Sequence, residues 1–363
     1  MLAVKPSQQH QGILPAKVML VDDSIVARSI FERILSQSEH IEIVCQAGNP
    51  EEALALLSKH DVDIILLDIE MPGRSGLDAL TDLIEKSNGA RILVVSSFAE
   101  ENGSAAIQAL SLGACDTLSK PGRSGFSGRF TQILFDKVIH LAKSAHLHGQ
   151  HKEASEYVPQ KQNGLSVKNG FVPSCLAIGA STGGIPAIYS VIDNLDDSID
   201  CPIFITQHLP STFIPFFATQ LASKTRRNVS VSTPGVIVQK NHIYVAPGDA
   251  HLVCRWEGKN IILDHDKDYE LTRYCPSVDA MFSSIAAVYG NGAIAIVLSG
   301  MGNDGTLGGQ SLALAGAKIF VQDSCSSVVW GMPGSIARSN LADVALPPDE
   351  IGGLISRLAA RND

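Results

Sequence analysis

Short apolar runs and amphipathic segments alternate along the N-terminal part of the chain. The runs that we interpret as strands are Val18–Val21, Ile41–Cys45, Ile64–Leu67, Ile92–Val95 and Asp116–Leu118. Strands that alternate with helices are typical of a doubly wound sheet in which all strands run parallel. We therefore predict a doubly wound α/β domain with a five-stranded parallel sheet over residues 17–141.

The segment after the first run has the apolar face of an amphipathic helix. Ile30, Phe31, Ile34 and Leu35 recur at helical spacing, and Ser24 precedes them as an N-cap residue. One side of this helix is therefore expected to be buried.

A polar stretch separates this domain from the rest of the chain. Between His146 and Asn169 no helical or strand period is sustained, which is typical of a linker. We place the linker at residues 142–173 and a second domain at residues 174–363.

Strands and helices alternate again after the linker, which predicts a second doubly wound α/β domain. Its predicted strands are Leu176–Gly179, Ile203–Thr206, Ala293–Leu298 and Ile319–Val321. The middle of this domain is more irregular, and we expect antiparallel hairpins among three short strand-like pieces there. These pieces are Val236–Val238, Ile243–Val245 and Ile261–Leu263.

Composition and charge narrow the class of protein. The 363 residues suit two domains, and 45% hydrophobic with 18% charged residues favours buried cores over extended disorder. A net charge of -9 without a basic cluster disfavours nucleic-acid binding. No stretch is apolar enough for membrane insertion, and residues 1–16 lack the apolar core of a signal peptide, so we expect a cytoplasmic protein.

Cysteines and histidines are arranged in a way that does not favour metal or disulfide chemistry. The seven cysteines include no C-x-x-C pair and lie mostly in apolar segments, so reduced core thiols are the simpler interpretation. Four histidines crowd the linker boundary without a Cys or carboxylate framework that would fix a metal. They are His140, His146, His148 and His151.

Three acids are expected at one edge of the first sheet. Asp22 and Asp23 directly follow the first strand, and Asp68 follows the third. The carboxyl ends of parallel strands meet at one edge, where such folds bind ligands. Carboxylate oxygens at this density repel one another unless a cation is present, and they suit Mg²⁺. Metal-assisted phosphoryl chemistry is the predicted use.

Two further strand ends contribute groups that suit a phosphoryl group. Lys120 follows the fifth strand and supplies a cation, and Ser96 ends the fourth strand and supplies a hydroxyl. Asp22 and Asp23 could instead cap the first helix. That interpretation leaves Asp68, Ser96 and Lys120 without a common explanation.

A Gly-rich turn follows the first strand of the second domain. In Gly179–Gly184 (GASTGG), Ser181 is expected on a tight turn, and Pro186 suits the first turn of the next helix. Backbone N–H groups there would face a developing oxyanion. The turn matches G-x-S-x-G, a nucleophile pattern that occurs readily by chance, and a phosphate-binding loop is the competing interpretation.

His208 and Asp304 favour the hydrolase interpretation. Each follows an apolar strand, so both are expected at the same sheet edge as Ser181. A serine needs a base, and an imidazole held by a carboxylate supplies one. Taken singly, His208 could be a core histidine and Asp304 a turn acid. Their chain order differs from that of the α/β-hydrolases, so that fold is not predicted.

The motifs of the first domain resemble those of response-regulator receiver domains. They are LVDDS, LLDIEMPGRSGLD, VVSS and SKP, within residues 17–141. The resemblance implies a flavodoxin-like fold for this domain. The resemblance implies one phosphorylation site with the phosphoacceptor Asp68, the Mg²⁺ ligands Asp22, Asp23 and Asp68, and the phosphoryl contacts Ser96 and Lys120. Thr117 stands where many receivers carry a switching aromatic residue, which speaks against an aromatic switch here.

The motifs of the second domain resemble those of the methylesterase domain of chemotaxis CheB proteins. They are GASTGG, QHLP, VAPGD, LSGMGNDG and a later GMP, and a preceding receiver is that family's own architecture. The resemblance implies Ser181 as nucleophile, His208 as general base and acid, and Asp304 as the orienting carboxylate. It also implies the backbone amides of Thr182 and Met301 as oxyanion donors.

The same resemblance implies an activity and its partners. We expect phosphorylation-activated hydrolysis of glutamate methyl esters on methyl-accepting chemotaxis receptors, with deamidation of receptor glutamines as a second activity. A chemotaxis histidine kinase would be the phosphodonor, Mg²⁺ would serve the receiver, and ester hydrolysis would need no cofactor. An unphosphorylated receiver packed over the triad would block the substrate.

Two alternatives stay open on the residues alone. The C-terminal domain could dock a partner without any chemistry, under control of the receiver. It could also hydrolyse some other ester or amide, because a triad does not specify the acyl group.

Overall fold

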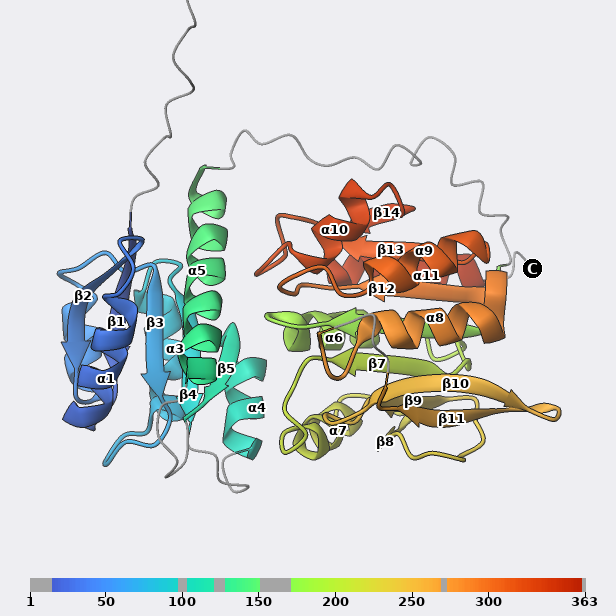
Figure 1. The fold of residues 1–363 in the computed structure, drawn as a ribbon, viewed down its shortest axis with the longest axis horizontal. Helices are drawn as coiled ribbons and strands as arrows, with labels where there is room; N and C mark the ends of the chain where they lie inside the picture. Colours follow the sequence, from blue (N-terminus) through green and yellow to red (C-terminus); the bar gives the residue numbers. More distant parts are fainter. Residues whose placement is uncertain (1–14, 97–102, 121–127, 151–170, 269–272, 361–363) are drawn as a thin grey trace, which may run out of the picture.

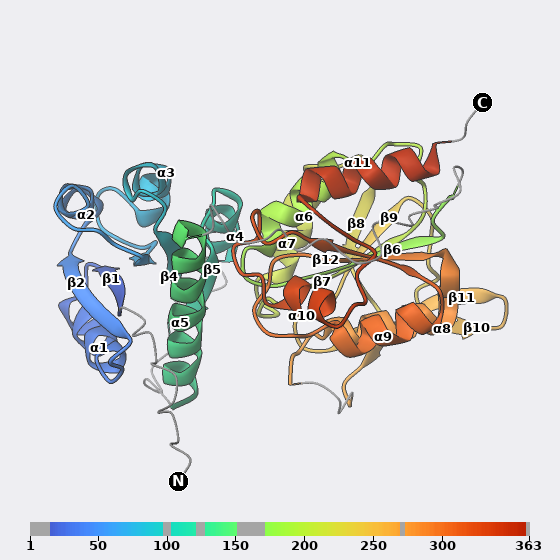
Figure 2. The ribbon, with the colours of Figure 1, turned by 90° about the horizontal axis from the view of Figure 1, so that it is seen from above.

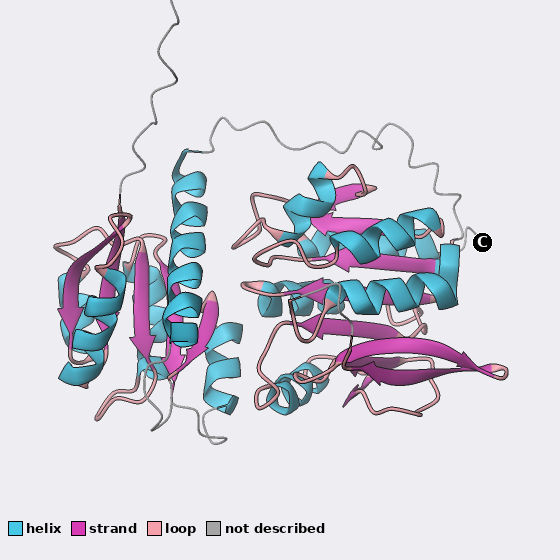
Figure 3. Ribbon diagram, in the orientation of Figure 1, coloured by secondary structure: helices cyan, strands magenta, loops and turns pink. Residues whose placement is uncertain are grey.

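The chain forms two α/β domains that lie side by side, each with its own sheet and covering helices (Figures 1 and 3). The computed structural model describes residues 15–96, 103–120, 128–150, 171–268 and 273–360, without the side chains of residues 129 and 143–150.

The N-terminal domain contains a five-stranded parallel sheet in the order β2-β1-β3-β4-β5. Its strands are β1 (Ala16–Val21), β2 (Ile41–Ala47), β3 (Ile64–Asp68), β4 (Arg91–Ser96) and β5 (Asp116–Ser119). Its helices are α1 (Ile25–Leu35), α2 (Pro50–Leu56), α3 (Gly76–Lys86), α4 (Gly103–Ser111) and α5 (Gly128–Gln150). The five predicted strands and the doubly wound receiver fold are confirmed, with small differences at the strand ends.

The two faces of this sheet carry separate cores, because successive residues of a strand point to opposite sides. Val18 and Leu20 of β1 pack with α1 and α5, whereas Met19 and Val21 pack with α2, α3 and α4. The apolar face predicted for α1 is also confirmed: Phe31 is buried with its neighbours on that face, and the Ser24 hydroxyl accepts from the N–H of Ala27 at 3.2 Å.

Helix α5 is longer than the sequence pattern indicated. We expected no regular structure from His146 onward, but α5 continues to Gln150. Leu141 and Ala142, the last residues of α5 with described side chains, are both buried. The rest of the predicted linker, residues 151–170, lies outside the described residues.

The C-terminal domain is built on a seven-stranded parallel sheet in the order β14-β13-β12-β6-β7-β9-β8. Its strands are β6 (Cys175–Ala180), β7 (Ile203–Gln207), β8 (Asn228–Val231), β9 (His242–Val245), β12 (Ala293–Val297), β13 (Lys318–Gln322) and β14 (Val344–Leu346). Its helices are α6 (Gly184–Asp193), α7 (Ile214–Ala222), α8 (Val278–Tyr289), α9 (Thr306–Leu314), α10 (Met332–Arg338) and α11 (Pro348–Ala359). The predicted doubly wound fold is confirmed here as well.

The strand order reverses at β6, which lies between β7 and β12. Ligands of open parallel sheets bind beside the carboxyl ends of the strands at such a point. The segments that leave β6, β7 and β12 carry Ser181, His208 and Asp304. Helices α6, α7 and α11 cover one face of the sheet, and α8, α9 and α10 cover the other.

The middle of this domain differs in part from the prediction. A two-stranded antiparallel sheet is present, and it joins β10 (His251–Glu257) to β11 (Asn260–Asp266). The expected piece 261–263 lies in this hairpin, but 243–245 belongs to the parallel sheet through β7 and β8. The piece 236–238 forms no strand and contributes one antiparallel bridge, Ile237 to Ile262.

The two domains touch along α4 and β5 of the first and α6, α7 and the Ser181 turn of the second. Seen from above, α4 lies between the two sheets beside α6 and α7 (Figure 2). The Ser111 hydroxyl donates to Oε1 of Gln220 at 2.8 Å, and the N–H of Gly183 donates to the carbonyl of Cys115 at 2.8 Å. The carboxyl edge of the second sheet therefore faces the first domain.

Candidate active site and phosphorylation site

Ser181 lies on the tight turn between β6 and α6. Gly183 has φ of 74°, a left-handed conformation that favours glycine, and a Cβ there would lie 2.4 Å from Val328. The Ser181 N–H donates to the carbonyl of Ser299 at 3.0 Å, and the side-chain amide of Gln207 donates to the Ser181 carbonyl at 2.9 Å. The turn is therefore fixed from β7 and from the segment after β12.

His208 and Asp304 form a hydrogen-bonded pair beside this turn. Nε2 of His208 lies 2.8 Å from Oδ2 of Asp304, and the carboxylate is fully buried while the imidazole is partly accessible. A carboxylate can only accept, so Nε2 carries the proton in this bond and the lone pair is on Nδ1. The pair has the arrangement of a base with its orienting acid.

Four further groups donate to the Asp304 carboxylate. Three of them come from the start of α8: the Ser277 hydroxyl at 2.9 Å, the Val278 N–H at 2.7 Å and the Asp279 N–H at 3.0 Å. The fourth is the N–H of Gly305 at 3.1 Å. Burial would raise the pKa of Asp304, but the bonds from His208 and the backbone outweigh it and hold that pKa below its usual range. Asp304 is therefore ionised at neutral pH.

Two backbone N–H groups near Ser181 are available to an oxyanion. Among the described residues, no hydrogen bond uses the N–H of Thr182 or of Met301. A Cβ on Gly300 would lie 2.9 Å from Cβ of Ser181, so the segment that carries Met301 passes directly against the serine. Such donors stabilise the negative charge that develops in acyl transfer.

The serine and the histidine are not joined by a hydrogen bond. Within the described part of the chain, no bond connects the Ser181 hydroxyl to His208. In the resting state of such enzymes this contact is often long and shortens only when substrate binds. The structure therefore places the three predicted residues at one edge without a completed proton path.

The first domain contacts the nucleophile turn directly. The Thr182 hydroxyl and the Lys137 ammonium both donate to Oδ2 of Asp116, which is buried at the start of β5. The neighbouring Cys115 carbonyl accepts from Gly183. The turn is thus held by one side-chain bond and one backbone bond from the receiver.

A cavity of about 440 Å³ remains between the two domains beside the histidine. On the receiver side it is lined by Asp116, Thr117, Leu118, Ser119, Phe130, Ile133 and Lys137. On the other side it is lined by His208, Leu209 and Pro210.

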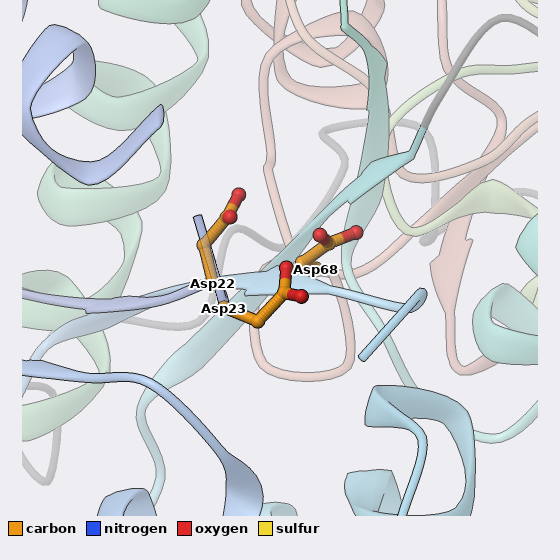
Figure 4. Close-up of side chains that lie close together, drawn as sticks. All are labelled: Asp22, Asp23 and Asp68. Atoms are coloured by element: carbon orange, nitrogen blue, oxygen red, sulfur yellow. The ribbon is translucent and has the colours of Figure 1, made fainter. Parts of the chain in front are cut away.

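The three acids of the first domain converge at the carboxyl edge of its sheet (Figure 4). One carboxylate oxygen from each of Asp22, Asp23 and Asp68 lies within 4.8 Å of the others. Asp22 and Asp68 are buried, whereas Asp23 is exposed. Oxygen ligands alone, with one side open to solvent, fit Mg²⁺, which keeps several waters and binds phosphate oxygens.

Lys120 and Ser96 lie at the same site. Nζ of Lys120 is 2.8 Å from Asp22 and 2.6 Å from Asp68. Burial raises the pKa of Asp68, and the Lys120 ammonium offsets part of that rise. The Ser96 hydroxyl is fully buried and has no hydrogen-bond partner among the described residues, so it is free to donate to a phosphoryl oxygen.

Thr117 is buried at the domain contact and lines the cavity beside His208. Of the four clustered histidines, only His140 has a described side chain, and its Nδ1 lies 2.6 Å from the carbonyl of Asp136. The seven cysteines carry thiols that are not joined in disulfides, and Cys275 and Cys325 are the two exposed ones. No helix in the described residues is long and apolar enough to cross a membrane.

Several residues at the site were not predicted from the sequence. Gln207, Ser277 and Asp116 contact the serine turn or Asp304, and Tyr274 contacts His208. Gln207 precedes His208 inside the QHLP motif, so this motif could have indicated that Gln207 belongs to the site. The others stand in segments whose local pattern carries no sign of the contact.

Comparison with known proteins was made for each domain and for the whole chain. Residues 176–355 match the family model CheB methylesterase, and residues 18–125 match the model Response regulator receiver domain. A Rhodospirillum rubrum protein named protein-glutamate methylesterase/protein-glutamine glutaminase 1 is 34% identical over 369 residues, which cover 95% of each chain. A protein of the same name from Hahella chejuensis is 35% identical over 359 residues, covering 95% of this chain and 97% of the relative.

A solved structure supports the fold of the second domain. The crystal structure of the Thermotoga maritima CheB methylesterase catalytic domain has a TM-score of 0.50 and 32% sequence identity. The match covers 51% of this chain and 98% of that one.

Proposed function

The chain belongs to the family of CheB methylesterases that carry a receiver domain, and from this premise we propose that it hydrolyses glutamate methyl esters on chemotaxis receptors. The identity of the ester, a glutamate methyl ester, comes from the names of the relatives. The observation that most directly supports ester hydrolysis is the hydrogen-bonded pair of His208 and the buried Asp304. The pair lies beside the turn that carries Ser181, where the N–H groups of Thr182 and Met301 are available to an oxyanion. We assign Ser181 as nucleophile, His208 as general base and acid, and Asp304 as the orienting carboxylate.

The reaction proceeds in two acyl-transfer steps. Nδ1 of His208 takes the Ser181 proton as Oγ attacks the ester carbonyl, and the N–H groups of Thr182 and Met301 bind the oxyanion. The C–O bond then breaks, and the imidazolium gives its proton to the departing methoxy group, which leaves as methanol. A water molecule, deprotonated by His208, hydrolyses the acyl-enzyme to free glutamate and restores the Ser181 hydroxyl.

Deamidation of receptor glutamines uses the same steps with ammonia as the leaving group. The names of the relatives include protein-glutamine glutaminase, which supports this second activity. Methyl-accepting chemotaxis receptors are the proposed substrate for both reactions.

The receiver supplies control through phosphorylation of Asp68. We assign Asp22, Asp23 and Asp68 to Mg²⁺, and Ser96 and Lys120 to the phosphoryl oxygens. When bound, Mg²⁺ neutralises the charge on the transferring phosphoryl group. A chemotaxis histidine kinase is the proposed phosphodonor. We propose domain limits of 17–141 for the receiver, 142–173 for the linker and 174–363 for the esterase, with the first part of the linker helical.

The closed arrangement of the domains supports inhibition by the unphosphorylated receiver. The receiver residues Asp116, Phe130 and Lys137 line the space beside His208, through which a receptor segment would have to reach the histidine. The bonds from Asp116 and Cys115 also hold the turn of Ser181. Strand β5 runs from Asp116 to Ser119 and leads directly to Lys120, so one short strand connects these contacts to the phosphorylation site.

Labelling with a serine-reactive fluorophosphonate tests whether the site is catalytic. The expected result is covalent labelling of Ser181 in the phosphorylated chain, with loss of labelling in Ser181→Ala and His208→Gln. A docking domain without chemistry would leave the hydroxyl inert in all three proteins.

A further inference from the structure

Tyr274 packs flat against the imidazole of His208. The two ring centroids are 5.0 Å apart and the ring planes differ by 7°. This is the offset stacked arrangement that aromatic rings favour. Tyr274 lies between β11 and α8, outside the motifs that carry the family resemblance.

The tyrosine is itself held by the segment that carries Asp304. The backbone of Asn303 lies close enough to the Tyr274 hydroxyl to lower the pKa of the phenol, against the larger effect of burial. Gly302 has φ of 88°, and a Cβ there would lie 2.0 Å from that oxygen, so the glycine makes room for the hydroxyl. Burial raises the pKa of Tyr274, which keeps the phenol neutral under ordinary conditions.

The residues that follow Tyr274 hold the other member of the pair. Ser277 and the N–H of Val278 donate to the Asp304 carboxylate. The same segment therefore supports the imidazole through a ring face and the carboxylate through hydrogen bonds.

The hydrogen bond to Asp304 fixes only one atom of the His208 ring. The ring can still turn about its Cβ–Cγ bond, and this rotation displaces Nδ1 further than it displaces Nε2. A parallel aromatic face removes this freedom, and it also stabilises the cation that His208 becomes during acyl transfer. We propose that Tyr274 is a positioning residue that sets the plane of His208 so that Nδ1 faces Ser181. The inference rests on the proposed function only in taking His208 as the base.

The test compares variants of the full-length chain, activated with Mg²⁺ and a small phosphodonor. Tyr274→Met removes the flat ring at similar volume, and Tyr274→Phe keeps the ring without the hydroxyl. Trp256→Met is the matched control, because Trp256 is an exposed aromatic residue on β10. The readouts are the rate of Ser181 labelling by a fluorophosphonate, and kcat and KM for methanol release from methylated receptor membranes.

We expect Tyr274→Met to lower kcat and the labelling rate about ten- to a hundredfold at unchanged KM, as for other lost positioning contacts. Tyr274→Phe should retain most of both rates, and Trp256→Met should match the native chain. Equal rates in Tyr274→Met and the native chain would overturn the inference, as would a Tyr274→Phe variant as slow as Tyr274→Met. A Tyr274→Met variant in which only KM changes would also overturn the inference.

A second variant covers the case in which Tyr274→Met does not fold. Tyr274→Leu also removes the flat ring, with a branched side chain, and should slow labelling to the extent expected for Tyr274→Met. A folded Tyr274→Leu chain that is labelled as fast as the native chain would count against the stacking role. Labelling needs no receptor ester, so Tyr274-dependent labelling without methanol release would refute the proposed substrate and leave this inference standing.

Discussion

The hydroxyl of Thr182, the residue after the proposed nucleophile, donates to the carboxylate of Asp116 in the receiver. The bond joins the turn of one domain to the first residue of β5 in the other. Because Thr182 also carries one of the two amides assigned to the oxyanion, the receiver holds the catalytic turn and does not only cover it. Inhibition then has two parts, which are blocked access and a restrained turn.

Asp116→Ala should raise the activity of the unphosphorylated chain. The change removes a charged hydrogen-bond acceptor across the interface, a contact worth about 1.5–3 kcal/mol, which corresponds to a shift of about tenfold or more toward the open arrangement. Methanol release measured without phosphodonor gives the effect. Glu85→Ala, an exposed acidic residue on α3, is the control. Equal basal rates in Asp116→Ala and the native chain would show that this contact does not restrain the enzyme.

Asp68→Asn should abolish activation without abolishing catalysis. The variant lacks the proposed phosphoacceptor, while the residues around Ser181 are unchanged. Methanol release should no longer respond to a small phosphodonor, and removal of Mg²⁺ with a chelator should have the same effect on the native chain. Asp61→Asn, an exposed acid before β3, should respond normally. Persistent activation of Asp68→Asn would mean that phosphorylation acts elsewhere.

Asp279 should make stability fall as pH rises through the weakly acidic range. Burial raises its pKa from 3.8 to about 6, with the Asp304 charge adding to the rise, so the folded chain binds more protons than the unfolded chain between these values. The free energy of unfolding therefore falls from about pH 4 to about pH 6, by at most about 3 kcal/mol.

Asp279→Asn cannot ionise and should lose this part of the pH dependence. Thermal unfolding followed from pH 4 to pH 8 compares the two proteins. The stability of Asp279→Asn relative to the native chain should increase over this interval and level off above pH 6 or 7. A constant difference across the whole interval would contradict the assignment.

Most of the fold and the shared location of the three proposed hydrolase residues could be predicted from the sequence for one physical reason. Parallel strands present their carboxyl ends at one edge, so a residue placed just after an apolar strand is assigned to that edge without any tertiary information. Ser181, His208 and Asp304 are each found where this rule places them. The acids around Asp68 follow the same rule.

The errors arose where local pattern does not determine the partner. The piece 243–245 is too short for its period to tell a parallel from an antiparallel strand, and its neighbours β7 and β8 lie elsewhere in the sequence. Strand β10 was missed because its second half, Arg255 to Glu257, is exposed and mixed in polarity. The hairpin with β11 is set by pairing between the strands, which the period of either strand does not reveal.

Three supporting residues, Tyr274, Ser277 and Asp116, could not be predicted from the sequence. Tyr274 and Ser277 precede α8 in an irregular segment, and their contacts with His208 and Asp304 depend on how two distant loops pack. In the sequence, Asp116 has no feature that distinguishes it from other strand residues, because its partner Thr182 belongs to the other domain. Contacts of this kind arise from tertiary packing and leave no trace in local spacing.

Methanol release from methylated receptor membranes tests the central claim most directly. The native chain and Ser181→Ala are compared, each with and without Mg²⁺ and a small phosphodonor. We predict release by the native chain that increases with phosphodonor, and none above background by Ser181→Ala under either condition. Release that is independent of Ser181, or no release by the native chain in any condition, would contradict the assignment of a receiver-controlled glutamate methylesterase.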